Sequence, residues 1–471
     1  MMLHRGLRGL SRRAPPSLLH AHGFAVSKDG EPAAVLTREY IYGALYASNG
    51  YFTTQEREVL HAPEQGIDFT NLFGQIEYRK VVAELYKQKR EAWLTPVEVF
   101  APYYSDAIAN YMLNSPHNQR NAMRIYEIGG GAGTNALHIL NYLRDHAPEV
   151  YAKAKYTLIE ISPVMAERQR QRVMSEHPDV CTVINTDILT FSDLHDVVNE
   201  QCFFVAMEVL DNLPHDKVVL RNGKWYETIV QANEDAQAAG RLDLTEHLRP
   251  VNDPLIRQTL EYFGCDLPLR TQYRLNNTFA KKVRAMFGQE EKELDAAFIP
   301  TGAMQLLNTL RASFPRHHLI AADFDELPPP TLNPKSSVKA LGHAMSPTST
   351  TEGTLCAANA PLVASKTSGE TEDHDTYLVQ GGVADIFFAT DFARLKKAYC
   401  MTLNRKTDEV SVVKSSAFLE AFADTKQTKT MTGYVAVGTR MNETNQLTQL
   451  IRHDRYNPLL QDYSNTSFIL S

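Results

Sequence analysis

The sequence predicts an α/β fold, an open and mostly parallel sheet covered by helices, and three observations support it. Between residues 124 and 209, short β-type runs alternate with amphipathic helical patterns, which is the order in which parallel sheets are built. A turn with four glycines in the five positions 129–133 separates the first strand pattern from the first helical pattern. Acidic residues follow the ends of successive strands, at the edge where ligands of such sheets bind.

Length and composition agree with a folded protein of one large domain or two smaller ones. Of the 471 residues, 43% are hydrophobic and 22% are charged, which is ordinary for soluble proteins. The net charge of -7 argues against nucleic acid as a partner, because such binding needs a basic surface. No apolar run approaches the roughly 20 residues that a membrane-spanning helix needs. The five cysteines form no CxxC pair, so neither a disulfide framework nor a metal site is expected.

Residues 1–28 differ in composition from everything that follows. They contain four arginines, with leucines at helical spacing, and no acidic residue stands before Asp29. This pattern is typical of a mitochondrial presequence, since the membrane potential pulls positive charge toward the matrix. We therefore expect a mitochondrial matrix protein. A disordered basic terminus is the alternative.

The core of the fold is expected at residues 116–327, after a mainly helical N-terminal region at 37–115. A charged segment at about 231–297 is predicted to be a helical insertion in this core. Strands of the core are predicted, in chain order, at residues 124–128, 156–161, 182–187, 202–209 and 318–323.

Three further segments complete the chain. The stretch 328–373 is rich in Pro, Ser and Thr and lacks periodicity, so it is expected to be a solvated loop that is disordered in part. The core is expected to resume at 374–440, with a last strand at Gly433–Gly438. Residues 441–471 are predicted to form a C-terminal tail outside the core.

The glycine-rich turn offers bare backbone to a ligand at the start of a helix. A dinucleotide fingerprint, GxGxxG, fails because Thr134 stands in place of its third glycine, and the Lys and Ser/Thr of a P-loop are absent. The spacing that is present is E-x-G-x-G-x-G, at Glu127, Gly129, Gly131 and Gly133. It resembles motif I of the class I S-adenosylmethionine-dependent methyltransferases. This resemblance implies their Rossmann-like sheet and S-adenosylmethionine as the cofactor.

Two more acidic residues extend the expected cofactor site. Glu160 ends the second predicted strand, where such folds place the acceptor for ribose hydroxyls. Asp187 ends the third strand, and in the class I methyltransferases that position lies beside the adenine. Each acid alone would be an ordinary solvated carboxylate, but their order along the strands favours a cofactor site.

Several segments together resemble the MidA-type family. Ala44–Tyr46 with Gly50–Phe52 resembles its ALY...GYY signature, Ile159–Pro163 resembles its VEISP, and Glu208–Pro214 resembles its NEFFDALP. Mitochondrial members of this family are described as protein arginine methyltransferases that act in the assembly of respiratory complex I. The resemblance therefore implies a protein partner with an arginine acceptor, and a complex I subunit is a candidate.

Glu208 and Asp211, after the fourth strand, are the candidate catalytic residues. Carboxylates bind the fork of a guanidinium group well, and this pair lies at the ligand-binding edge of the sheet. A turn that Asp211 stabilises ahead of Pro214 is an equally open interpretation. His215 could accept a proton, although a lone loop histidine is expected at the surface.

Two departures from the family pattern keep other functions open. Leu94–Val99 matches the family's TSPEISxxFGE loop only loosely, and Met207 stands where the family has Asn. One alternative is a non-catalytic assembly or interaction protein that keeps the fold. The other is a methyltransferase for small molecules.

Overall fold

The computed structural model describes most of the chain, and the expected presequence at 1–28 lies outside the described residues. The described residues are 34–54, 66–88, 92–117, 123–232, 244–265, 295–331, 357–367, 370–432, 434–436, 450–452 and 456–471.

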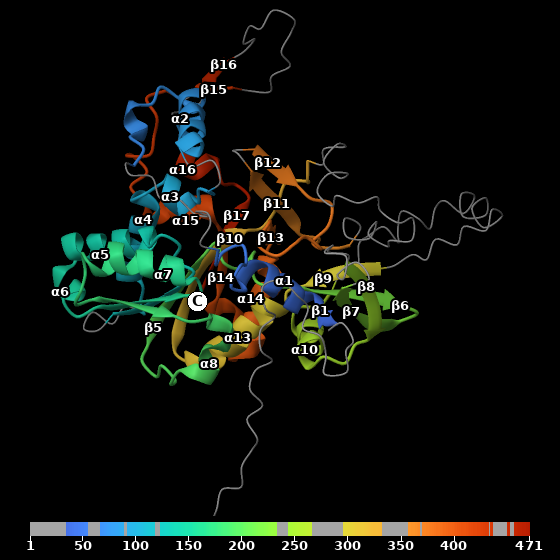
Figure 1. The fold of residues 1–471 in the computed structure, drawn as a ribbon. Coiled ribbons are helices and arrows are strands. Elements are labelled where there is room, and N and C mark those ends of the chain that lie inside the picture. The colour runs from blue at the N-terminus through green and yellow to red at the C-terminus, as the bar shows by residue number, and fades with distance from the viewer. Residues whose placement is uncertain are drawn as a thin grey trace, which may run out of the picture.

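A seven-stranded sheet forms the centre of the molecule (Figure 1). Its strands lie in the order β14-β17-β10-β5-β2-β3-β4. Five of them, β2 to β5 and β10, are parallel, and β17 runs antiparallel to both of its neighbours. The strand bounds are β2 (Arg124–Ile128), β3 (Lys155–Glu160), β4 (Cys181–Asn185), β5 (Cys202–Met207), β10 (His317–Phe324), β14 (Ser411–Lys414) and β17 (Thr466–Leu470). All five strands predicted for 124–323 are present in this sheet, which confirms the α/β fold.

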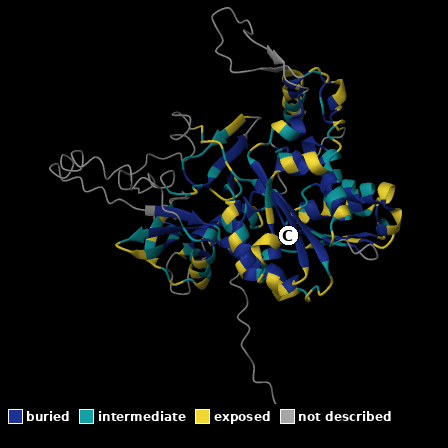
Figure 2. Cartoon of the chain, turned by 180° about the vertical axis from the view of Figure 1, so that it is seen from behind, coloured by how far each residue is buried: buried dark blue, intermediate teal, exposed yellow. Residues whose placement is uncertain are grey.

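Helices cover both faces of the central sheet, and this explains the apolar composition of its strands. Every residue of β5 is buried, as expected for a parallel strand with helices on both sides. Alternate residues of each strand face opposite layers: Val205 packs with α4 and α5, whereas Phe204 packs with α13 and α14. Figure 2 shows the strands buried and the exposed residues on the outer sides of the helices. The bounds are α4 (Tyr103–Asn114), α5 (Thr134–His146), α13 (Thr301–Ser313) and α14 (Phe392–Leu403).

Further helices complete these layers and the N-terminal region. They are α1 (Thr37–Tyr46), η1 (Phe69–Asn71), α2 (Gln75–Gln88), α3 (Pro96–Val99), α6 (Pro148–Tyr151), α7 (Pro163–Gln169), η2 (Arg170–Met174), η3 (Ile188–Thr190), α8 (Phe191–Leu194), α10 (Pro254–Tyr262), η5 (Thr407–Glu409), α15 (Ser415–Phe422) and α16 (Pro458–Gln461). No helix among the described residues is long and apolar enough to span a bilayer.

A second sheet, in which all pairs of described strands are antiparallel, stands where a helical insertion was predicted. It consists of β1 (Val35–Leu36), β6 (Asp216–Arg221), β7 (Lys224–Ala232), β8 (Leu244–Pro250) and β9 (Asp295–Ile299). In the described part of 231–297, only α10 is helical, while 233–243 and 266–294 lie outside the described residues. The charged composition is misleading because β8 is an edge strand with alternating exposed residues, and charged side chains are common on such edges.

Two more differences concern the C-terminal third. The end of the predicted loop 328–373 contains β11 (Leu362–Thr367) and β12 (Glu370–Asp373), which pair with each other, and β11 also pairs with β13 (Asp385–Phe387). The segment 332–356 lies outside the described residues.

The predicted tail also contains part of the core. Its residues Thr466–Leu470 form β17, which is fully buried between β10 and β14. The strand predicted at 433–438 is instead β15 (Tyr434–Ala436), in a separate two-stranded sheet with β16 (Leu450–Arg452). A short apolar run does not reveal which strands it pairs with, so the sequence pattern could not show that β17, and not β15, belongs to the central sheet.

Candidate active site

Two adjoining cavities lie at the carboxyl ends of the parallel strands. The larger cavity has a volume of about 310 Å³, and the smaller cavity has a volume of about 120 Å³. They share part of their lining, namely Phe52, Gly129, Gly131, Glu208 and Asn212. The glycine-rich turn and the residues after β5 therefore stand at the junction of the two cavities.

The three motif glycines adopt left-handed backbone conformations but have different surroundings. Gly129 has φ +62° and Gly131 has φ +50°, and both line the two cavities. Gly133 has φ +80° and stands at the N-terminus of α5. A Cβ atom at Gly133 would lie 2.7 Å from Cγ2 of Val173, so this glycine allows close helix packing. It lines neither cavity.

Glu127 supports the turn from beneath. Its carboxylate accepts hydrogen bonds from Nδ2 of Asn135 and from the hydroxyl of Tyr156, both at 2.8 Å. Burial raises the pKa of Glu127 to about 7. The side chain contributes to the lining of the larger cavity, but its two hydrogen bonds also tie β2 to α5 and β3.

Glu160 and the glycine turn face the same space, as the sequence predicts. The Glu160 carboxylate accepts hydrogen bonds from the backbone N–H of Ser162 at 2.9 Å and from Nε2 of Gln169 at 3.0 Å. The same Nε2 atom donates to the carbonyl of Gly131 at 2.9 Å. Gln169 thus links the turn to Glu160 along the wall of the smaller cavity. Burial raises the pKa of Glu160 to about 7.

Asp187 also lines the smaller cavity and holds part of its wall. It accepts hydrogen bonds from the N–H of Leu189 at 2.8 Å and from the hydroxyl of Tyr42 at 3.0 Å. Its pKa is raised, mainly by burial. Tyr42 and Tyr46 reach the cavity from α1, and sequence reasoning did not single them out. The ALY motif at Ala44–Tyr46 was the available signal for Tyr46, but the position of α1 above the sheet depends on tertiary packing.

Glu208 and Asp211 both line the larger cavity. Glu208 also lines the smaller cavity and has φ 53°, a conformation that is rare outside glycine. In the described part of the chain, its carboxylate has no hydrogen-bond partner. Asp323 holds this turn, because its carboxylate accepts the N–H of Leu210 at 2.7 Å and of Asp211 at 3.1 Å.

Electrostatics make these two carboxylates unusual. The pKa values of Glu208 and Asp211 are raised well above the usual range. Burial is the largest cause, and the neighbouring carboxylate of Asp323 is the second. Atom Oδ1 of Asp211 is buried without a hydrogen-bond partner among the described residues. A buried polar atom without a partner is costly, so this atom is suited to a ligand that brings a donor.

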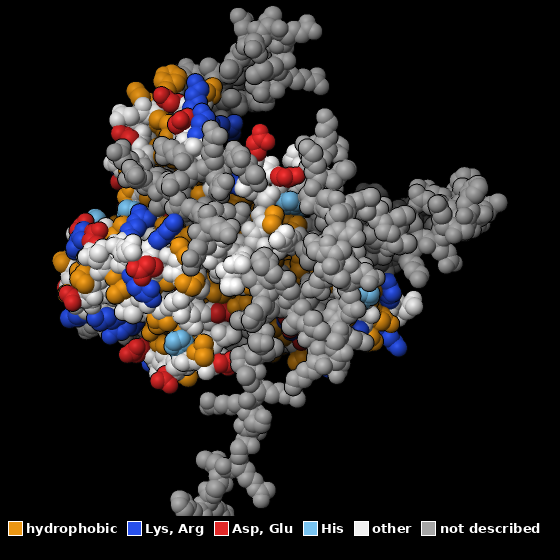
Figure 3. Space-filling model, viewed as in Figure 1, with side chains coloured by type: hydrophobic (Ala, Val, Ile, Leu, Met, Phe, Trp, Pro, Cys, Tyr) orange, Lys and Arg blue, Asp and Glu red, His pale blue; other side chains and the backbone are white. Residues whose placement is uncertain are grey.

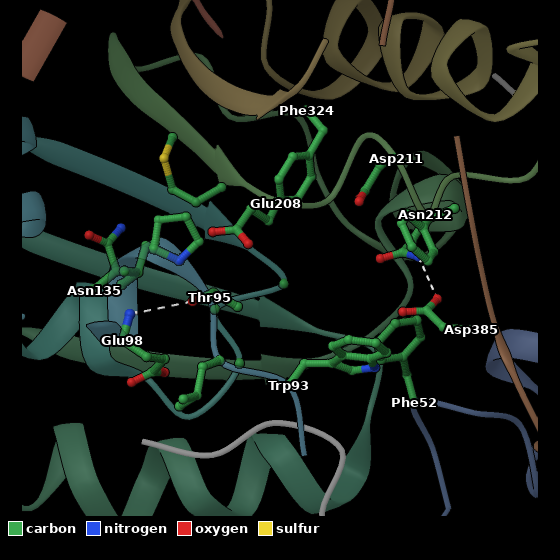
Figure 4. A pocket seen from close by; sticks show the side chains of 18 of the residues that line it. Phe52, Trp93, Thr95, Glu98, Asn135, Glu208, Asp211, Asn212, Phe324 and Asp385 are labelled. Atoms are coloured by element: carbon green, nitrogen blue, oxygen red, sulfur yellow. Dashed lines mark hydrogen bonds between the residues drawn. The ribbon is translucent and has the colours of Figure 1, made fainter. Parts of the chain in front are cut away.

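Two further acids complete the larger cavity (Figure 4). Glu98 is positioned by α3, where the Thr95 side chain caps the helix and Pro96 starts it. It accepts a hydrogen bond from Oγ1 of Thr134 at 2.8 Å, and burial raises its pKa to about 7. Asp385 accepts a hydrogen bond from Nδ2 of Asn212 at 2.8 Å. Glu98 lies in the loop Leu94–Val99 that was compared with the family, but neither Glu98 nor Asp385 was chosen as a site residue.

Aromatic side chains form a further part of the wall of the larger cavity: Phe52, Tyr86, Trp93, Phe324, Phe387 and Tyr463. His215 belongs to neither cavity, and it is buried rather than at the surface. Its ring stacks on Phe388 with centroids 3.8 Å apart. Burial lowers its pKa to about 4, so the imidazole stays neutral at physiological pH.

The residues present fit a sulfonium nucleoside. The smaller cavity combines Glu160 and Asp187 with apolar side chains, which suits a ribose and a base. The bare turn at the junction could accommodate the methionyl part. Among the described residues, no cluster of His, Cys, Asp and Glu could hold a metal ion.

Comparisons with known proteins indicate a family for this chain. Residues 107–411 match a family model described as "Putative S-adenosyl-L-methionine-dependent methyltransferase". A mitochondrial protein of Schizosaccharomyces pombe, named as a protein arginine methyltransferase NDUFAF7 homolog, is 23% identical over 233 residues, which are 47% of this chain. The match spans about half of that relative, 48% of its length.

A solved structure from Burkholderia thailandensis, with S-adenosyl-homocysteine bound, shares the fold. Its TM-score is 0.50 at 14% identity, and the match covers 84% of this chain and 78% of that chain. The family match covers more than half of the 471 residues and confirms the resemblance seen in the motifs. The chain therefore belongs to this family of S-adenosyl-L-methionine-dependent methyltransferases.

Proposed function

We propose that this protein transfers a methyl group from S-adenosylmethionine to an arginine side chain of a protein. The observation that carries the proposal is the acidic lining of the larger cavity. Five carboxylate residues line it, and no Lys, Arg or His is among its lining residues: the acids are Glu98, Glu127, Glu208, Asp211 and Asp385. Such a cavity favours a cationic acceptor, because carboxylates attract and hydrogen-bond a guanidinium group.

The cofactor would occupy the smaller cavity and the junction. Gly129 and Gly131 leave room for the methionyl part, Glu160 accepts the ribose hydroxyls, and Asp187 lies on the adenine side. When bound, S-adenosylmethionine supplies an electrophilic methyl group, so the protein mainly needs to bind, orient and exclude water. Glu127 supports the turn from below, and Gly133 allows α5 to pack close behind it.

Glu208 and Asp211 are the proposed catalytic residues. Glu208 lines both cavities, so it stands where the acceptor nitrogen and the methyl group would meet. Carboxylates that bind two nitrogens of the guanidinium leave the third one to attack. In the transfer, the bond between the nitrogen and the methyl carbon would form as the bond between that carbon and the sulfonium sulfur breaks, with S-adenosylhomocysteine as the leaving group, and the attacking nitrogen must lose a proton. A carboxylate with a raised pKa can take that proton.

The expected place of action is the mitochondrial matrix, in the assembly of respiratory complex I. The basic, acid-free residues 1–28 and the family resemblance support this proposal, and the Schizosaccharomyces pombe relative is named as mitochondrial. Figure 3 shows Lys and Arg interspersed with Asp and Glu on the visible face. Together with the net charge of -7, this supports a protein rather than a nucleic acid as the acceptor.

The test uses Asp211→Asn, which keeps the shape and removes the charge. The variant should bind S-adenosyl-homocysteine within about twofold of wild type by calorimetry. Mass spectrometry of mitochondrial proteins from cells that lack this chain should show a missing methyl-arginine, which wild-type protein restores and the variant does not. Asp193→Asn, on exposed α8, is the matched control.

Three results would contradict the proposal. Full methylation by Asp211→Asn would remove the role of this carboxylate. Transfer of the methyl label to a metabolite instead of a protein would favour a small-molecule methyltransferase. Unchanged methyl-arginine in cells without the chain, together with loss of complex I, would favour a non-catalytic assembly protein.

A further inference from the structure

A buried lysine stands behind the aromatic wall of the larger cavity. Lys366, on β11, is 8% exposed. Its Nζ atom donates a hydrogen bond to the carbonyl of Ala92 at 2.8 Å. The same atom lies 4.0 Å from the ring centroid of Trp93 and 4.4 Å from that of Tyr86. In the described part of the chain, no carboxylate forms an ion pair with it, so the two ring faces are its main electrostatic partners.

The two rings separate this ammonium group from the cavity. Trp93 and Tyr86 line the larger cavity, whereas Lys366 does not. Trp93 is held further by its Nε1 atom, which donates to the hydroxyl of Tyr51 at 2.8 Å. Figure 4 shows Trp93 in the wall, opposite Glu208 in that view.

This arrangement changes what the wall can bind. An aromatic ring attracts a cation through the negative charge of its face. Here the ammonium group of Lys366 already lies over these rings, on the side away from the cavity. Its positive charge repels a second cation on the cavity side of the rings. The carboxylates of Glu208 and Asp211 attract the same cation elsewhere in the cavity. The rings are therefore left to contact the apolar stem of an acceptor side chain rather than its charged end.

We propose that Lys366 is a positioning residue, which directs the cationic group of the acceptor away from Trp93 and Tyr86 and toward the carboxylates of Glu208 and Asp211. This inference rests on the proposed function, because it assumes a cationic acceptor in the larger cavity. It predicts that an acceptor binds in one orientation while Lys366 is charged. Without that charge, the rings offer a second, unproductive place for a guanidinium group.

The first experiment tests the contact itself without any acceptor. The sequence has two tryptophans, so Trp225→Phe leaves Trp93 as the only source of indole fluorescence. Burial lowers the pKa of Lys366 to about 8, and the emission of Trp93 should titrate near that pH. Tyr86 stays protonated there because burial raises its pKa, and the residue opposite Lys366 on β12 is the neutral Thr371.

Two substitutions decide the origin of this titration. Acids such as Glu98 and Glu127, with pKa values of about 7, line the same cavity as Trp93 and are present in every variant. In the Trp225→Phe background, Lys366→Met and Lys366→Arg should each remove the part of the emission change that occurs near pH 8. Identical titration curves for the Trp225→Phe protein and its Lys366→Met and Lys366→Arg variants would overturn the contact on which the inference stands.

The second experiment separates positioning from a structural role. Calorimetry with S-adenosyl-homocysteine bound would use a peptide with one arginine and a matched peptide with citrulline. Lys366→Met should bind the arginine peptide at least as tightly as wild type, yet methylate it at least tenfold more slowly. Lys366→Arg should restore the rate.

Parallel loss of binding and rate in Lys366→Met would mean a merely structural role and would overturn the proposal. Wild-type protein that does not prefer the arginine peptide to the citrulline peptide would instead refute the proposed function. In that case the fluorescence titration still shows whether Lys366 holds the wall of the cavity.

Discussion

Single residues in this site are carboxylates held in places where their charge is costly. Glu160 is 4% exposed, and its partners are one backbone N–H and one side-chain amide. A ribose would bring two hydroxyl donors to such an acceptor. The protein leaves part of the hydrogen-bonding capacity of this buried carboxylate unused. A ligand that donates hydrogen bonds to it therefore reduces the cost of its burial, and this favours binding.

Glu160→Gln tests this role at the residue scale. The amide keeps the shape but loses the charge, and we expect the Kd for S-adenosylmethionine to rise at least tenfold in calorimetry. Stability to urea at pH 8 should not fall, because a buried charge is removed. Glu149→Gln, on exposed α6, should change neither property. An unaltered Kd would place the ribose contact elsewhere.

At the scale of elements, the glycine turn owes its shape to its position between β2 and α5. Gly131 and Gly223 both have positive φ values, +50° and +72°. Gly223 stands in the turn between β6 and β7, with open space around it, whereas Gly131 borders both cavities. Substitutions at these two glycines therefore distinguish the effect of backbone strain from the effect of filling the space for the ligand.

Gly131→Val should abolish binding of S-adenosylmethionine, because a side chain would stand where the cofactor passes. Gly223→Val carries a similar backbone strain and should bind normally. Calorimetry of both variants, with circular dichroism to confirm folding, checks this expectation. Equal binding by the two variants would show that the turn at Gly131 does not face the cofactor.

The helix α1 is another element whose position matters, because it carries Tyr42 and Tyr46. Arg38 fastens it: one guanidinium nitrogen lies 2.7 Å from Asp216, and another lies 2.7 Å from Asp253. Asp216 is fully buried. Removing one partner of a buried ion pair leaves an uncompensated charge, which costs about 3 to 5 kcal/mol.

Arg38→Met should therefore lower the free energy of unfolding by about 3 kcal/mol, measured by urea denaturation. Cofactor affinity should fall with it, because Tyr42 hydrogen-bonds to Asp187 from the loosened helix. Arg257→Met, which removes an exposed arginine on α10, serves as the control. A small loss, under about 1 kcal/mol, would mean that this pair behaves like a surface ion pair.

For the whole molecule, the buried acids link stability to pH. The pKa of Glu127 is about 7 in the folded protein, above the value of about 4.3 expected when unfolded. Its contribution to stability is therefore fully present below about pH 4.3 and is lost as the pH rises toward 7, with a slope of at most about 1.4 kcal/mol per pH unit.

Glu127→Gln isolates this contribution. We expect wild-type stability, relative to the variant, to fall between pH 5 and 7 and then to level off. The comparison matters because buried histidines such as His317, with a pKa lowered to about 4, act in the opposite sense in both proteins. Urea denaturation at several pH values measures the difference, and a constant difference would contradict the raised pKa.

Local patterns were enough to predict much of the fold and part of the site. The strands β2, β3, β4, β5 and β10 follow from apolar runs and intervening helical periodicity, and Glu160 follows from its place at a strand end. Glu98 and Lys366 could not be predicted in this way. Their roles depend on neighbours far along the chain, such as the Lys366 contact with Ala92 across 274 positions.

What the sequence by itself determined was the parallel α/β core, the bare turn after β2 and the methyltransferase family. These features depend on periodicity and on residue types within a few dozen positions. Only the tertiary structure decided that β17 enters the sheet between β10 and β14, that five acids meet in one cavity, and that a lysine stands behind its aromatic wall. Burial and long-range pairing arise from packing the whole chain, and no local pattern records them.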